Sequence, residues 1–96
     1  MVAVLFEEFI PMVSHVIRDF NGLSMSVCKS RKGYRYIDIL DNDGYVVLTP
    51  AREVKNNFSS IHKVESVSRT SIGVVAAITE VINSGTYHEQ KAMMKR

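Results

Sequence analysis

Four positively charged side chains within seven residues, next to two tyrosines, have the clearest potential for chemistry in this chain. These residues, called the basic hairpin below, are Lys29, Arg31, Lys32, Tyr34, Arg35 and Tyr36. Cationic side chains bind phosphates, and tyrosine rings stack on exposed bases, as in many RNA-binding proteins. A second interpretation is a solvated turn whose charges discourage pairing between sheet edges. The nearby Asp38, Asp41 and Asp43 offset part of the charge, which favours the second interpretation.

The stretch Asp41-Asn42-Asp43-Gly44 resembles part of a calcium-binding loop, in which carboxylates alternate before a required glycine. If Gly44 occupied the sixth position of such a loop, Ile39 would be the first ligand and Pro50 the twelfth. Neither residue has the side-chain oxygen that these two positions need. The stretch instead predicts a tight turn, because aspartate, asparagine and glycine tolerate the backbone angles of a hairpin connection.

The histidine and cysteine residues have no spacing that is typical of metal binding or catalysis. His15, His62 and His88 lie far apart, and Cys28 is the single cysteine, so the sequence contains no His-x-x-x-His or Cys-x-x-Cys motif. We therefore expect no catalytic residue, no metal and no cofactor, and a protein that is not an enzyme. A fold that brought Cys28 close to histidines and carboxylates would revive the enzyme hypothesis.

Length and composition predict a single small globular domain that spans residues 1–96. Twelve Lys and Arg against ten Asp and Glu leave a net charge of +2, which is low for a protein that wraps a nucleic-acid backbone. A lone cysteine fits a reducing compartment, and no apolar run approaches the roughly 18 residues of a membrane span. Met1 to Phe6 lacks the basic region of a signal peptide. We expect a cytoplasmic protein without membrane contact.

Apolar spacing predicts the elements before the basic hairpin. Leu5–Phe20 has apolar residues at intervals of three and four, which indicates an amphipathic helix. Because proline is tolerated in the first helical turn, Pro11 indicates a start near Glu8 and would leave Val2–Phe6 for a short edge strand. Leu23–Cys28 alternates between apolar and polar residues, as in a strand with one covered face.

Two more strands are expected within and after the basic hairpin. Ser30–Gly33 turns the chain into a strand in which Ile37 and Ile39 face the core and Tyr36 faces the other side. Tyr45–Leu48 is the return strand after the Asp-Asn-Asp-Gly turn. Together the three strands predict an antiparallel meander that needs a helical cover.

The second half of the chain predicts further helices. Thr49-Pro50 is typical of a helix start and predicts a short helix to Ile61, because threonine caps free N–H groups and proline suits the first helical position. Val64–Arg69 is expected to be a connector, with a fourth strand as the alternative. Ser71–Asn83 predicts a helix whose buried stripe starts at Ile72. That stripe is Ile72, Val75, Ile78 and Ile82.

The last eleven residues, 86–96, are called the tail below and predict a short docking or frayed helix opened by Thr86-Tyr87-His88-Glu89. Its apolar side chains suit two roles, contact with a second subunit or packing against the chain's own core. The sequence leaves both roles open. The expected oligomer contacts are Tyr87, Met93 and Met94.

The predicted fold is α+β, a three-stranded antiparallel meander packed on one face by an N-terminal and a C-terminal helix, with short accessory helices. In topology it is similar to the double-stranded RNA-binding domain over Leu5–Asn83. Ser68–Ser71 stands where that family has a lysine cluster, and Ser30–Gly33 where it has a Gly-Pro-x-His loop. The order of elements also looks like that of several small viral inhibitors of host defence.

These observations predict a non-enzymatic, inhibitor-like regulatory module that binds another macromolecule through the basic hairpin. We expect a protein partner in preference to a nucleic acid, and a homo-oligomer. The alternative is an RNA- or DNA-binding protein that uses residues 29–36 for the same purpose.

Overall fold

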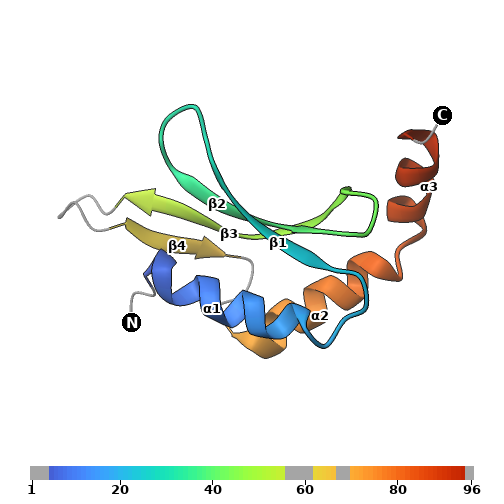
Figure 1. Ribbon diagram of the computed structural model, residues 1–96, viewed down its shortest axis with the longest axis horizontal. Helices are drawn as coiled ribbons and strands as arrows, with labels where there is room; N and C mark the ends of the chain where they lie inside the picture. Colours follow the sequence, from blue (N-terminus) through green and yellow to red (C-terminus); the bar gives the residue numbers. More distant parts are fainter. Residues whose placement is uncertain (1–4, 56–61, 67–69, 95–96) are drawn as a thin grey trace.

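A four-stranded antiparallel sheet with helices on one face forms the body of the protein (Figure 1). The computed structural model describes residues 5–55, 62–66 and 70–94. The elements are α1 (Phe6–Ile17), β1 (Ser24–Lys29), β2 (Arg35–Leu40), β3 (Val46–Lys55), β4 (His62–Ser66), α2 (Ser71–Ile82) and α3 (Gly85–Met94). The strand order β1-β2-β3-β4 follows the chain. The predicted α+β fold with its meander of β1, β2 and β3 is confirmed, and the structure adds β4.

The core lies between the sheet and the helices α1 and α2, which lie side by side on one face (Figure 1). Its buried side chains are Phe6, Phe9, Val13, Val16, Ile37, Ile39, Val47, Ala51, Val74 and Ile78. Ile37 and Ile39 are fully buried, as predicted, because alternate residues of β2 point to the same face. Tyr36 and Asp38 therefore lie on the opposite face. We call it the open face, since α1 and α2 do not cover it.

The segment after Leu48 is a strand, so the prediction of a helix from Thr49-Pro50 is wrong. Pro50 is buried within β3, an inner strand of the sheet, where a proline would normally remove a ladder hydrogen bond. The register shifts there, because Ala51 pairs with Ile37 and Leu48 pairs with Ile39. Three steps along β3 therefore face two steps along β2, and this bulge accommodates the proline. The rest of the predicted helix, 56–61, lies outside the described residues.

The fourth strand and α2 also differ from the first expectation. β4 corresponds to the fourth strand that the sequence offered as the alternative to a connector over 64–69. Residues 67–69 lie outside the described part. α2 has the predicted extent, and its first turn is capped by Thr70 Oγ1, which accepts from the Gly73 N–H at 3.1 Å. However, it buries Val74 and Ile78, while Ile72 is 81% exposed. Because α2 is apolar on nearly every side, spacing alone could not identify the buried face.

Helix α1 begins at Phe6, earlier than the predicted start near Glu8, and Pro11 lies inside it. Leu5 is its N-cap, and residues 1–4 of the predicted edge strand lie outside the described part. The helix ends at Ile17, three residues before the predicted end at Phe20, and Gly22 in the connection that follows has φ of +79°. A Cβ atom at Gly22 would lie 2.6 Å from the Asn42 side chain, so the end of the α1 connection packs closely on the β2–β3 turn.

Replacing Pro11 with alanine should stabilise the protein. Pro11 is the sixth residue of α1, beyond the first turn, so its missing N–H leaves the Glu7 carbonyl without the usual helical hydrogen bond. We expect Pro11→Ala to raise the free energy of unfolding in urea by about 1–3 kcal/mol, less the entropy that proline removes from the unfolded chain. His15→Ala, at an exposed position of the same helix, is the control and should change it by less than about 0.5 kcal/mol. A loss of stability in Pro11→Ala would contradict this account of α1.

Candidate functional site

A groove of about 670 Å³ lies between the β1–β2 turn and the C-terminal part of β3. Its lining residues are Ser30, Arg31, Lys32, Tyr34, Tyr36, Arg52, Glu53 and Val54. The groove thus brings together four residues of the basic hairpin, two cations and two tyrosines. It adds Arg52, whose Cα pairs with that of Tyr36 across β2 and β3. The sequence did not identify Arg52, because the incorrect helix placed it on a different element.

The β1–β2 turn holds the cationic side of the groove in a defined conformation. The Ser30 N–H donates to the Tyr34 carbonyl at 2.7 Å, and the Gly33 N–H donates to the Ser30 carbonyl at 3.0 Å. Ser30 Oγ also accepts from the Tyr34 N–H at 3.1 Å. Gly33 has φ of +90°, a conformation that glycine adopts without strain. Arg31 and Lys32 are therefore carried by a hydrogen-bonded turn with a glycine bulge.

The charges of Arg31 and Lys32 are available to an external anion. Both side chains are exposed, and neither forms an ion pair with any residue in the part of the chain that the structure describes. Next to them, Tyr36 is a neutral hydrogen-bond donor at physiological pH. The neighbouring Cys28, burial and Asp38 all raise the pKa of Tyr36. The groove can therefore offer both cations and a tyrosine hydroxyl to carboxylate or phosphate oxygens.

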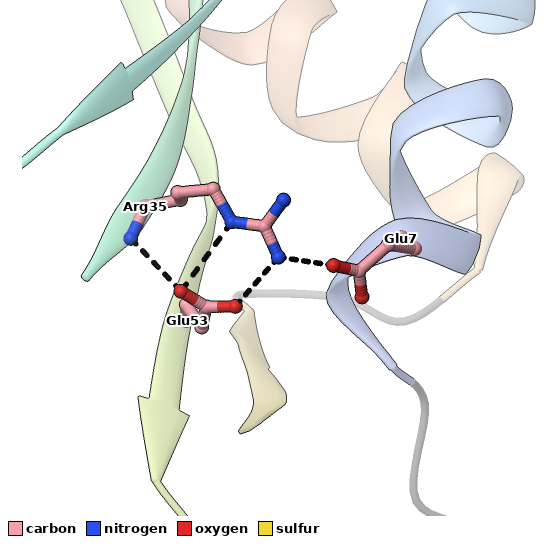
Figure 2. Close-up of polar contacts among 3 residues, drawn as sticks. All are labelled: Glu7, Arg35 and Glu53. Carbon is pink, nitrogen blue, oxygen red and sulfur yellow. Dashed lines mark hydrogen bonds and ion pairs between the residues drawn. The ribbon is translucent and has the colours of Figure 1, made fainter. Parts of the chain in front are cut away.

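Arg35, by contrast, forms an ion-pair cluster on the helix-covered side of the sheet (Figure 2). Its Nη2 lies 2.8 Å from Glu53 Oε2 and also pairs with Glu7 Oε1 at the start of α1. Its backbone N–H donates to Glu53 Oε1 at 3.1 Å, and its guanidinium lies 4.8 Å from the ring centroid of Phe6. The cluster joins α1 to β2 and β3. Neither Arg35 nor Lys29 lines the groove.

Glu53 is the reason why Arg35 points inward. Its side chain is only 5% exposed, and a buried carboxylate needs a cation and hydrogen bonds to offset the loss of water. The hydrogen bond from Arg35 likewise lowers the pKa of Glu7. Sequence reasoning missed Glu53, because the incorrect helix from Thr49-Pro50 placed this residue on a different element.

Cys28 lies beside two polar side chains of β1 and β2 on the open face. Cys28 Sγ lies 3.4 Å from Ser26 Oγ and 3.9 Å from Asp38 Oδ2. The His88 ring lies elsewhere, with Nε2 2.7 Å from the Ile82 carbonyl. Within the described residues, no three His, Cys, Asp or Glu side chains lie close enough together to hold a metal ion. No described helix has the length and apolar character needed to cross a membrane.

Most of the tail belongs to α3, and this helix docks on the β2–β3 turn. The Tyr87 hydroxyl donates to Asp41 Oδ2 at 2.5 Å. Lys91 Nζ lies 2.7 Å from the same oxygen and 2.8 Å from Asp43 Oδ2. The Tyr87 ring also packs edge-on against Tyr45, with centroids 5.6 Å apart. These contacts hold α3 at the end of the sheet (Figure 1).

The predicted oligomer contacts of the tail therefore have different environments. Tyr87 contacts its own chain, which is one of the two roles that the sequence left open. Met93 is 72% exposed and accessible to a partner. Met94 is the last residue of α3, and its side chain lies outside the described part of the structure. α3 begins at Gly85, one residue before the predicted start.

Asp41 has a strongly perturbed carboxyl group in this docking contact. Burial raises its pKa, and hydrogen bonds from Lys91 and Tyr87 to Oδ2 lower it. The N–H groups of Asp43 and Tyr45 also donate to Oδ1, at 2.9 and 3.0 Å. Together they hold the pKa of Asp41 well below its usual range. The turn and the docked helix thus depend on the same ionised side chain.

Comparison with known protein families, curated proteins and solved structures gives no significant match to this chain. The fold and the geometry of the groove are therefore the basis for the functional argument. What they define is a small α+β protein with a basic, tyrosine-lined groove.

Substitution of Arg35 separates a structural role from a binding role. Arg35→Met would leave the buried Glu53 carboxylate without its guanidinium, and we expect urea unfolding to show a loss of about 2 kcal/mol. Adding Glu53→Gln removes the buried charge, so the double variant should lose less than the sum of the two single variants. Lys29→Met, at a neighbouring exposed cation, is the control and should cost less than about 0.5 kcal/mol. Equal effects of the two methionine variants would refute a structural role for Arg35.

The docking of α3 should weaken in acid. The pKa of Asp41 is depressed in the folded state, so its contribution to stability is complete above the unfolded pKa of about 3.9 and is lost as the pH falls towards the folded value. Asp41→Asn keeps an oxygen acceptor for the turn but removes the charge. Urea unfolding should show it to be less stable than the natural protein at pH 7, with the difference shrinking steadily as the pH falls below about 4. A difference that stayed constant with pH would contradict this role for the carboxylate.

Proposed function

We propose that this protein is a non-enzymatic, regulatory binding module that captures an acidic segment of a protein partner in its groove. The observation that carries the proposal is the meeting of Arg31, Lys32 and Arg52 with Tyr34 and Tyr36 in one concave site. Carboxylates bind guanidinium and ammonium groups, and the tyrosine rings supply apolar contact with a polar end. A site of this kind binds by surface contact and needs no catalytic group.

The charge distribution favours a short acidic segment over a long polyanion. Asp38 lies on the open face, two residues from Tyr36, and its Oδ1 accepts from Thr49 Oγ1 at 2.8 Å. A strand of phosphates that left the groove across the open face would meet this carboxylate. The net charge of +2 also indicates that positive potential is local. A cytoplasmic location belongs to the same proposal, because Cys28 is a free thiol that fits a reducing compartment.

Single-stranded RNA or DNA is the second candidate ligand. Tyr34 and Tyr36 share the groove with three cations, and base stacking on tyrosine beside a basic surface is a common mode of single-strand binding. The two candidates differ in their salt dependence, since release of counterions from phosphates makes nucleic-acid binding fall steeply with salt.

Fluorescence anisotropy with labelled probes tests the proposal. The probes are a Glu- and Asp-rich peptide of about ten residues, its Gln and Asn counterpart, and single-stranded RNA and DNA of similar length, at about 50 and 200 mM salt. We expect the acidic peptide to bind and its neutral counterpart to bind more weakly. Tighter binding of a nucleic acid, with at least about a tenfold loss at the higher salt, would favour the second candidate. No binding of any probe would refute the groove as an anion site.

Variants of the groove provide the matched comparison. Arg31→Ala and Lys32→Ala should each weaken binding of the acidic peptide by about two- to fivefold, the range expected for exposed ion pairs. Arg18→Ala, which removes an exposed cation at the end of α1, should leave affinity unchanged. An equal effect of all three variants would mean that net charge, and not the groove, determines binding.

A further inference from the structure

The outer side of β1 is an open sheet edge. β1 is the first strand in the order β1-β2-β3-β4, and all six of its residues pair with β2 without a bulge. In the part of the chain that the structure describes, no strand pairs with its other side (Figure 1). Proteins usually protect such edges with prolines, bulges or several charges. β1 has one charged residue, Lys29 at its end, and none of the other devices.

The register shows which backbone groups of β1 point outward. The Ser30 N–H donates to the Tyr34 carbonyl, and hydrogen-bonded pairs alternate along an antiparallel ladder. In that alternation Ser24, Ser26 and Cys28 form the hydrogen-bonded pairs with β2. Met25, Val27 and Lys29 must therefore direct their N–H and C=O groups away from β2. The Arg35 N–H agrees with this alternation, because it donates to Glu53 and not to β1.

Val27 is the centre of this edge and is incompletely covered. It pairs with Ile37, which is fully buried, and so lies on the helix-covered face. Yet its side chain is 42% exposed, because a strand at the sheet edge has a neighbour on one side only. The edge thus combines outward backbone hydrogen-bonding groups with an exposed β-branched side chain.

We propose that β1 pairs with β1 of a second copy of this chain, antiparallel, about a two-fold axis at Val27. Val27 then lies opposite Val27 of the partner subunit, and the exposed side chains cover each other. Met25 lies opposite Lys29 of the partner subunit, so no two like charges face one another. The outward residues exchange about six main-chain hydrogen bonds. This self-complementarity is the argument for a second copy as the occupant of the edge.

The dimer would form one continuous eight-stranded sheet. In an antiparallel extension of a sheet the two-fold axis is perpendicular to it, so both sets of helices lie on one side and both open faces on the other. The two basic grooves would then face the same direction, one on each subunit. This inference does not depend on the identity of the groove ligand.

An engineered disulfide tests the proposed register. Ser26 would lie opposite Cys28 of the partner subunit in a non-hydrogen-bonded pair, where Cα atoms are about 4.5 Å apart and a disulfide fits. Under mild oxidation, Ser26→Cys should run as a covalent dimer on a non-reducing gel. Ser24→Cys, two residues away on the same face, should not, because it would lie opposite Ser30 of the partner subunit. Equal crosslinking of the two variants, or none in Ser26→Cys, would overturn the proposed pairing.

Sedimentation equilibrium tests the interface in the absence of a crosslink. Between about 1 and 100 µM the natural chain should approach twice its 10.8 kDa mass. Val27→Lys would place two ammonium groups face to face and should raise the dissociation constant at least about tenfold. Ile72→Lys, at an exposed apolar position of α2, should not change it.

Three results of that experiment would overturn the proposal. One is a monomer at all concentrations, and another is an unchanged dimer in Val27→Lys with a circular dichroism spectrum like that of the natural protein. Loss of the dimer in Met93→Lys but not in Val27→Lys would place the interface in the tail and overturn the proposal in the same way.

Discussion

Burial of a single face of the sheet is the constraint on which the rest of this structure depends. Ninety-six residues supply two helices that cover the side of Ile37 and Ile39, and a chain of this size has little more to bury. The open face and the outer edge of β1 therefore remain accessible. Function is expected at those two places, because they are where polar and apolar groups meet solvent without a partner from α1 or α2.

Strand alternation divides the basic hairpin into two roles. Arg35 and Tyr36 are neighbours in sequence, yet their side chains lie on opposite faces of β2. Arg35 is thereby committed to the buried Glu53 and to Glu7, where it ties α1 to the sheet. Tyr36 joins Arg31 and Lys32 in the groove. A cluster that looks uniform in sequence is thus part structural support and part exposed surface.

Elements remote in sequence are joined by a few polar contacts at the two ends of the sheet. At one end the Arg35 cluster connects α1 with β2 and β3, and at the other Asp41 connects the β2–β3 turn with α3. Both depend on carboxylates that are paired in the folded state. They position α1 and α3 relative to the strands, while the core between sheet and helices supplies the main driving force.

By itself, the sequence determined that α1 and α2 are helices, that β1 and β2 alternate between two faces, and that the chain turns at Gly33 and Gly44. Apolar periodicity and glycine conformation are local properties, so they can be read from neighbouring residues. It also identified four groove residues. Only the tertiary structure decided that Pro50 lies in a bulged inner strand, and this brings Arg52 beside Tyr36. It likewise decided which charged residue is buried and which face of α2 packs. Those outcomes depend on pairing between segments distant in the chain, and no local pattern of residue types encodes that register.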